Sequence, residues 1–334
     1  MVRRGIAVTL FLAALAVLAF AAQTATVQAA PPKQNGVVGN PGKGAYLFAL
    51  AGGCGCHMGA AGFLAGGEVF ELGPAGKVYA KNITSDVETG IGSWTEEDVV
   101  NALRHGKRPD GEQLFPVMPY PYFSGMSEQD LHDVAAFIKT APPVSNKVPA
   151  RELNVPVPPF TAPPQPADAP TEGVARGSYI VNTIAHCSDC HTPTTAEGAP
   201  DMSRFLAGNP MFGSANITPS EEFGIGKWSQ EQIYLLLKTG KRPDGSSVGG
   251  LMQLVLDGGL HDITEKDGFA VAAYLKTVPP VNAAPGAAAP PAAPPPQTLP
   301  TTGNSTPSML IPLIAVVLML LAGGAFVWRS ARKV

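Results

Sequence analysis

Apolar residues in the middle of the chain recur at helical spacing behind residues that begin helices. Thr95-Glu96-Glu97-Asp98 supplies a cap and an acidic first turn, and the apolar positions that follow continue to Gly106, a natural helix end. Similar segments begin at Ser127, Ser229 and Thr264. No alternating pattern typical of strands accompanies them, so the hydrophobic pattern predicts an all-α fold.

A longer apolar run lies near the N-terminus. Residues 6–22 follow Arg3 and Arg4 and precede small residues, which is typical of a secretory signal peptide over residues 1–29. The run is slightly long for a signal peptide, so an uncleaved membrane anchor is the alternative. Both interpretations place the body of the protein outside the cytoplasm.

A second apolar run ends the chain. Residues 309–328 carry no charge, and a helix of this length spans about 30 Å, the hydrocarbon thickness of a bilayer. The run predicts a transmembrane helix, and the basic tail at 329–334 is expected to stay on the cytoplasmic side. Just upstream, Leu299–Gly303 resembles the sorting signal that sortases cleave between Thr and Gly. A plain membrane anchor and covalent attachment to the cell wall both remain open.

Composition separates the domains from what joins them. The chain has 37 Gly and 34 Pro among 334 residues, and only 15% of its residues are charged. Two stretches rich in proline, 146–172 and 282–308, favour extended polyproline spacers and divide the chain into domains at 39–145 and 173–281. A net charge of −3 argues against nucleic-acid binding.

The two domains are copies of one unit. Asn82-Ile83-Thr84 recurs at 216–218, and Gly106–Gly111 recurs unchanged at 240–245, in both cases 134 positions later. A second frame with an offset of 137 relates residues 135–140 to 272–277. Such matches in register indicate an internal repeat.

The second unit contains Cys187-Ser188-Asp189-Cys190-His191, a C-x-x-C-H motif. In an exported protein this motif predicts c-type haem attachment, because two thiols add to the haem vinyl groups while the adjacent imidazole reaches the iron. A redox dithiol or half of a zinc site is the alternative. The histidine that follows and the repeat argue against both.

The first unit has a shorter motif, Cys54-Gly55-Cys56-His57. Residues two apart point to nearly opposite sides of a helix, so either the turn unwinds and both thiols bond, or only Cys56 does. Because the repeat around the motif is intact, we expect a haem here too. The sequence therefore predicts two covalently attached haem c groups, with His57 and His191 as proximal iron ligands.

Methionines are the expected distal ligands, from a loop before the last helix of each unit. Met118 and Met252 share the offset of the two histidines, and a soft thioether stabilises ferrous iron. The competitors Met126, His105 and His261 have no matching residue in the other unit.

Several motifs together carry a family resemblance. They are Asn-Ile-Thr at 82 and 216, Gly-Ile-Gly-x-Trp at 90 and 224, Arg-Pro-Asp-Gly at 108 and 242, and Met118-Pro119-Tyr120. With the haem motifs, they make the chain resemble class I-type cytochromes c, most closely the multihaem cytochrome c subunits that accept electrons from membrane-bound alcohol and sugar dehydrogenases. Those subunits commonly carry three haems and this chain has motifs for two, so the electron donor does not carry over.

The resulting hypothesis is a membrane-anchored, extracytoplasmic di-haem cytochrome c that carries electrons and is not an enzyme. Its redox partners would be a donor such as a dehydrogenase and an acceptor such as an oxidase or another cytochrome. The alternative is a di-haem enzyme, either a peroxidase or a thiosulfate-oxidising cytochrome. Such enzymes need an open iron position or a spare thiolate, whereas all four cysteines here lie in haem motifs.

Overall fold

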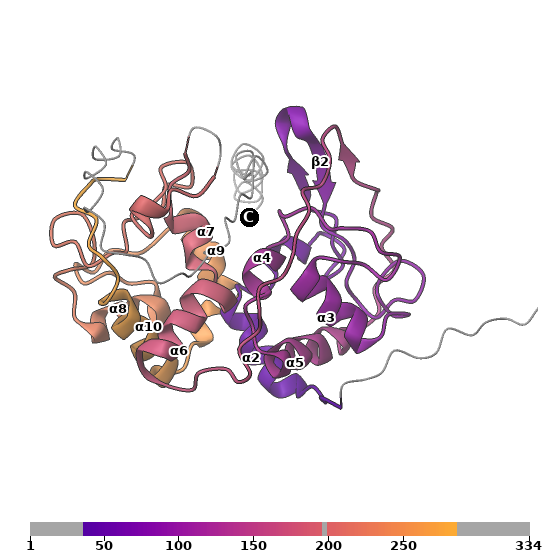
Figure 1. Ribbon diagram of the computed structural model, residues 1–334, viewed down its shortest axis with the longest axis horizontal. Helices are drawn as coiled ribbons and strands as arrows, with labels where there is room; N and C mark the ends of the chain where they lie inside the picture. The colour runs from indigo at the N-terminus through magenta and orange to yellow at the C-terminus, as the bar shows by residue number, and fades with distance from the viewer. Residues whose placement is uncertain (1–35, 196–198, 286–334) are drawn as a thin grey trace, which may run out of the picture. The chain divides into compact units, whose positions relative to one another are not determined.

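The computed structural model describes residues 36–195 and 199–285 (Figure 1). The predicted signal peptide at 1–29, the sorting-like motif Leu299–Gly303, the transmembrane helix at 309–328 and the basic tail at 329–334 lie outside these residues. Within the described ranges, no helix is long and apolar enough to cross a membrane.

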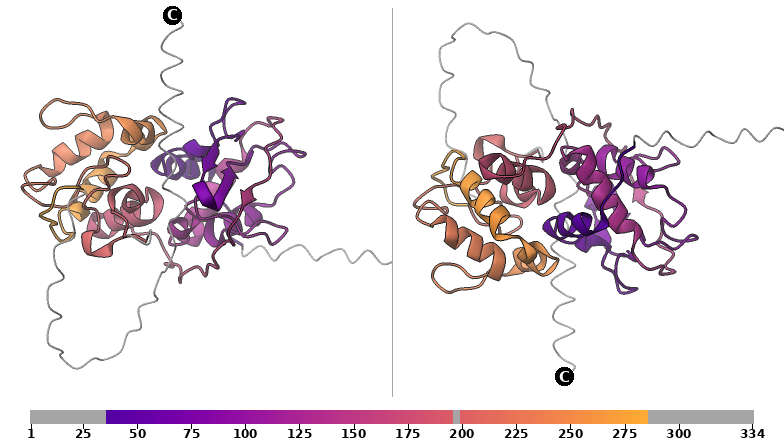
Figure 2. Two further views of the ribbon diagram at one scale, coloured as in Figure 1. Left: turned by 90° about the horizontal axis from the view of Figure 1, so that it is seen from above. Right: turned by 90° about the horizontal axis from the view of Figure 1, so that it is seen from below.

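The first repeat, in indigo to magenta in Figures 1 and 2, is built around three helices and a short fourth one. They are α2 (Pro41–Leu50), α3 (Glu96–His105), α4 (Tyr120–Phe123) and α5 (Glu128–Lys139). Helix α5 packs against both α2 and α3. Thr95 caps α3 in a reciprocal capping box with Asp98, and Gly106 ends the helix at a φ of 62°. The predicted helix starts at Thr95 and Ser127 are confirmed.

The second repeat has the corresponding helices. They are α6 (Gly173–Tyr179), continued by a π-helical turn (Ile180–Ile184), then α7 (Cys187–His191), α8 (Gln230–Thr239), α9 (Gly250–Asp257) and α10 (Glu265–Leu275). Helix α10 packs against α6 and α8. Ser229 and Thr264 are the N-caps of α8 and α10, as predicted.

Short 3₁₀ turns lie between the other elements of the two repeats. They are η1 (Gly55–His57), η2 (Gly73–Ala75), η4 (Met202–Arg204) and η5 (Leu260–Asp262).

A small antiparallel sheet was not expected from the sequence. Its strands, in the order β1-β2-β3, are Val69–Glu71, Gly76–Tyr79 and Glu152–Leu153. Two to four residues are too few to show an alternating pattern, so the prediction of an all-α chain is right for the helices and wrong for this sheet.

The third strand comes from the segment predicted to be a proline-rich linker. The same segment makes further contacts with the first repeat. The guanidinium of Arg151 donates to the carbonyl of Gln113 at 2.6 Å, and the amide of Gln165 donates to the carbonyl of Met126 at 3.1 Å. Much of the linker therefore lies along the first repeat.

The Asn-Ile-Thr motifs form the same buried network of hydrogen bonds in both repeats. The Asn82 side-chain oxygen accepts from the amide and hydroxyl of Thr84 at 3.0 and 2.7 Å, and its NH₂ donates to the Val144 carbonyl at 2.7 Å. Asn216 makes the matching bonds with Thr218 and Val281. Both asparagines are 2% exposed. The motif thus ties the loop after the haem-motif region to the chain that follows the last helix.

Repeat-related glycines set the closest helix contact in each unit. A Cβ on Gly44 of α2 would lie 1.8 Å from the backbone oxygen of Asp133 in α5. A Cβ on Gly177 of α6 would lie 1.9 Å from the oxygen of Ala270 in α10. Any side chain at these two positions would push the helices apart.

We expect Gly44→Ala and Gly177→Ala each to destabilise the folded protein by about 1–3 kcal/mol, because the added methyl overpacks a backbone contact. The measurement is denaturant unfolding followed by circular dichroism. Gly42→Ala is the matched control, since Gly42 is exposed on the same helix as Gly44 and a Cβ there approaches only Asn40 Oδ1, at 3.3 Å. Equal stability of all three variants would contradict the proposed contact.

Candidate haem-binding sites

The second motif occupies one helical turn. His186 has a left-handed backbone conformation with φ 35°, so the chain turns at this residue. Helix α7 then runs from Cys187 to His191. Spacing of three residues in a helix puts Cys187 and Cys190 on the same side. Burial raises the pKa of Cys187 to about 12, and burial together with the charge of Asp189 does the same for Cys190. These thiols are protonated at neutral pH.

The shorter first motif adopts a tighter turn. Cys54 takes a left-handed conformation, with φ 48° and ψ 44°, and the 3₁₀ turn of Gly55–His57 follows it. A 3₁₀ turn has three residues and not 3.6, so it accommodates a motif with one residue fewer. Cys56 is exposed, whereas Cys54 is half-buried, and burial raises the pKa of Cys54 to about 12. The left-handed Cys54 and the 3₁₀ turn after it together compensate for the missing residue.

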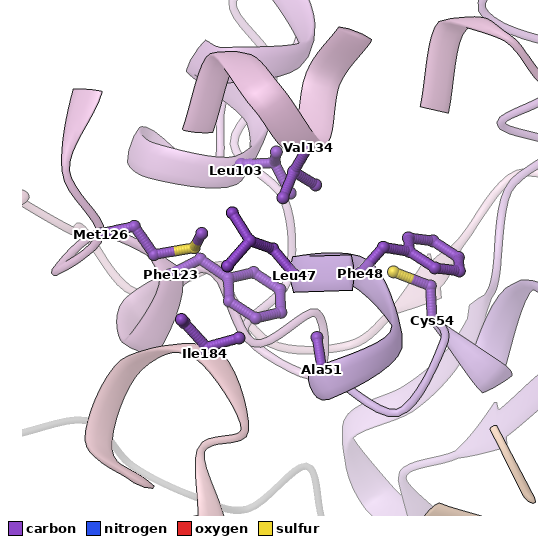
Figure 3. Close-up of a pocket in the computed structure, with 9 residues that line it drawn as sticks. All are labelled: Leu47, Phe48, Ala51, Cys54, Leu103, Phe123, Met126, Val134 and Ile184. Carbon is purple, nitrogen blue, oxygen red and sulfur yellow. The ribbon is translucent and has the colours of Figure 1, made fainter. Parts of the chain in front are cut away.

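An apolar pocket that contains Cys54 is lined by the first repeat and by Ile184 of the second repeat. In Figure 3 the sulfur of Cys54 lies beside Phe48 at one end of the pocket, and the sulfur of Met126 lies beside Phe123 at the other. The lining residues are Leu47, Phe48, Ala51, Cys54, Leu103, Phe123, Met126, Val134 and Ile184. One thiol of the motif is therefore directed at an apolar space, as attachment of a large apolar group requires.

The two motif histidines are held in the same way. Nδ1 of His57 is 2.6 Å from the carbonyl oxygen of Lys81, and Nδ1 of His191 is 2.7 Å from that of Ala215, in each case 24 residues further along the chain. A carbonyl accepts only from N–H, so Nδ1 carries the proton and Nε2 keeps its lone pair. Burial lowers the pKa of both imidazoles, against the opposing effect of the carbonyl. Two neutral imidazoles with fixed rings fit the ligation of iron.

The candidate methionines occupy different kinds of structure. Both are half-buried and pack against the core. Met118 lies in a loop before α4, as predicted, but Met252 lies within α9, so the prediction of a loop is wrong there. The first repeat has prolines at 116, 119 and 121, which interrupt a helix, and the second has none in this segment.

Met126 is a residue of the hydrophobic core that also lines the pocket containing Cys54. It is 3% exposed and lines the pocket beside Phe123. Ile263 occupies the matching position of the second repeat, so Met126 has no methionine partner there. Met126 comes immediately before Ser127, the N-cap of the last helix, and this position was the signal that the sequence offered. His261 was another candidate for the distal iron ligand. Its Nδ1 lies 2.5 Å from the carbonyl oxygen of Leu256.

The second motif also contacts the first repeat, which sequence reasoning missed. The hydroxyl of Tyr122, in α4, donates to Oδ1 of Asp189 at 3.5 Å. The ring of His186 packs against the rings of Tyr122 and Phe123, with centroids 5.7 and 5.6 Å apart. The segment between the two cysteines of one repeat is thus packed against the helix that follows Met118 in the other.

The alternatives of a zinc site and a redox dithiol do not fit this geometry. Within residues 36–195 and 199–285, no three His, Cys, Asp or Glu side chains gather as a metal site would require. None of the four cysteines is paired in a disulfide, and the pKa of each thiol is raised. A reactive dithiol needs a lowered thiol pKa.

Comparison with known proteins identifies the family. No protein-family model matches the chain. Among curated proteins, it is 34% identical over 255 residues to the fructose dehydrogenase cytochrome subunit of Gluconobacter japonicus, covering 71% of this chain and 52% of that protein. It is 34% identical over 270 residues to the cytochrome c subunit of a quinone alcohol dehydrogenase from Gluconacetobacter polyoxogenes, covering 73% and 57% respectively.

A shorter relative matches almost end to end. A diheme cytochrome c-type protein of Cereibacter sphaeroides is 34% identical over a 284-residue alignment, and the match covers 77% of this chain and 92% of that protein. The chain thus spans just over half of the dehydrogenase subunits but nearly all of the di-haem protein. The chain belongs to the di-haem cytochromes c of the class I type, related to the cytochrome c subunits of dehydrogenases, and it carries two covalently bound haem c groups.

Proposed function

We propose that this protein is an electron carrier, anchored to the outer side of the cytoplasmic membrane, that moves single electrons between redox proteins. The observation that carries the proposal is the repeated geometry of His57 and His191, each fixed by a backbone carbonyl next to motif cysteines. Both imidazoles are set to bind iron permanently, which suits a carrier.

In this proposal His57 and Met118 would hold the iron of the first haem, and His191 and Met252 would hold that of the second. When bound, each haem supplies an iron that takes up and returns one electron. The carbonyls of Lys81 and Ala215 fix the two imidazole rings and make them more basic, and a methionine thioether bound to the iron would raise the reduction potential.

The names of the relatives suggest the partners. Relatives are cytochrome subunits of fructose, alcohol and gluconate dehydrogenases. We therefore propose a dehydrogenase as the electron donor and an oxidase or another cytochrome as the acceptor. The apolar run at 309–328 would anchor the protein, and the signal-like segment at 1–29 would direct its export.

Substitution of the ligands by leucine tests the carrier against an enzyme. Leucine nearly conserves volume, so Met118→Leu and Met252→Leu should each fold and each remove about half of the ferric absorption band that arises from methionine-to-iron charge transfer. Met126→Leu is the control and should keep the whole band. Loss of the band in Met126→Leu would make Met126 the ligand, and a high-spin spectrum in the unsubstituted protein would favour a di-haem enzyme.

Single cysteine variants test how the first haem is attached. Because the Cys54 thiol lines the apolar pocket, we expect both sulfurs to bond, so that Cys54→Ala and Cys56→Ala each keep a covalent haem with one unsaturated vinyl group. The pyridine haemochrome spectrum reports each vinyl group, and mass spectrometry reports the haem peptide. Cys54→Ala/Cys56→Ala should lose this haem and keep the one at Cys187 and Cys190. An unchanged spectrum in Cys54→Ala would show that Cys56 alone is bonded.

Removal of the C-terminal run tests the anchor. A chain that ends at residue 308 should appear in the soluble extracytoplasmic fraction, whereas the full chain should sediment with membranes, because about 20 apolar residues suffice to span a bilayer. Haem content per chain should be the same for both. Soluble behaviour of the full chain would contradict membrane anchoring, and release by cell-wall digestion would indicate use of the sorting-like motif.

A further inference from the structure

Two tyrosines join the repeats in opposite directions. The hydroxyl of Tyr46, on α2 of the first repeat, donates to Oδ2 of Asp267 on α10 at 2.8 Å. The hydroxyl of Tyr179, on α6 of the second repeat, donates to Oδ2 of Asp130 on α5 at 2.8 Å. The tyrosines are 133 residues apart, as are the first motif cysteines Cys54 and Cys187, and the aspartates are 137 apart, the second offset of the internal repeat. We call these four residues the tyrosine clasp.

Each tyrosine enters the cap of a helix in the other repeat. The amide of Thr264, the N-cap of α10, donates to the Tyr46 oxygen at 3.2 Å, and the amide of Ser127, the N-cap of α5, donates to the Tyr179 oxygen at 2.8 Å. In an ordinary capping box, the third residue of the helix accepts from the N-cap amide directly.

Helix α3 shows that ordinary arrangement within one repeat. Asp98 accepts from the amide of Thr95 at 2.8 Å with nothing between them. In α5 and α10 the aspartate occupies the same third position, but a tyrosine hydroxyl from the other repeat stands between the amide and the carboxylate. The last helix of each repeat is therefore capped with the help of the other repeat.

Each clasp aspartate has a cationic partner within its own repeat. Lys43 lies 2.6 Å from Asp130, and Arg176 binds Asp267 through Nε at 3.0 Å and Nη2 at 2.8 Å. Burial opposes ionisation of Asp267, but hydrogen bonds from Arg176 and Tyr46 hold its pKa below the ordinary value. Asp130 is fully buried and Asp267 is 6% exposed, so each carboxylate depends on both of its partners.

The same interface reaches the haem motifs. A Cβ on Gly53, next to Cys54, would lie 2.1 Å from the backbone oxygen of Gly258, which follows α9. On the other side, Tyr122 contacts Asp189 between the second pair of cysteines. The surface fixed by the clasp is thus continuous with both attachment segments.

We infer that the tyrosine clasp locks the two repeats into an internal pseudo-twofold dimer, in which each repeat completes the cap of the other repeat's last helix. The exchange of equivalent contacts is the signature of an isologous interface. The lock rests on these contacts alone and does not depend on the proposed function.

Hydrogen exchange on the haem-loaded full chain tests the lock. Tyr46→Phe keeps the ring but removes the hydroxyl that accepts from Thr264, so exchange should accelerate about tenfold at amides 264–267, in the other repeat. Tyr179→Phe should do the same at amides 127–130. Exchange that accelerates only in the repeat carrying the substitution would overturn the proposal.

Two other tyrosines provide matched controls. The Tyr79 hydroxyl bonds Glu152 at 3.1 Å, and the Tyr274 hydroxyl accepts from Asn182 at 2.9 Å within the second repeat. Tyr79→Phe and Tyr274→Phe each remove one tyrosine hydrogen bond that lies outside the clasp. They should leave exchange at 127–130 and 264–267 unchanged, and acceleration there would show a general loosening and overturn the specific role.

Discussion

The contact between the first and last helix of each repeat is the constraint on which the remaining structure depends. Gly44 and Gly177 let α2 and α6 lie directly on the backbones of α5 and α10. Two residues later in each helix comes the tyrosine of the clasp, and about eight residues beyond it comes the first motif cysteine. One close crossing therefore sets the position of both the haem attachment and the interface.

The two repeats share the hydrogen bonds that hold the backbone around this helix contact. They differ in the segments that carry the candidate methionine ligands. Lys139 donates to the carbonyls of the Gly-Ile-Gly-x-Trp loop, including Ile91 at 3.2 Å, and Lys276 donates to Ile225 and Gly226 at 3.0 and 2.6 Å. By contrast, the methionine segments differ, with a proline-broken loop at Met118 and a helix at Met252. Such differences give the two sites distinct surroundings on one scaffold.

The sequence predicted the features that depend on residues close together in the chain. Helix starts at Thr95, Ser127, Ser229 and Thr264 follow from a cap and a few apolar positions, and the histidine pair follows from the spacing of the cysteine motifs. The three-stranded sheet escaped notice because its strands are shorter than the period needed to recognise them. The ligand assignments stay predictions.

The sequence did not predict the tyrosine clasp, for a different reason. It joins residues 221 and 49 positions apart, and no local pattern tells which partner a tyrosine hydroxyl will find. The recurrence of Tyr46 as Tyr179 and of Asp130 as Asp267 was visible in the sequence, but recurrence alone does not distinguish a contact within a repeat from one between repeats. Only the three-dimensional arrangement makes that distinction.

The attachment of the linker to the first repeat has a consequence for how strong the clasp must be. Because Glu152 and Leu153 form a strand and Gln165 bonds the Met126 carbonyl, only a short stretch remains to bridge to α6. A short tether gives the second repeat an effective concentration in the millimolar range at its own docking surface. A few hydrogen bonds, too weak to hold two separate proteins together, then suffice to keep the repeats docked.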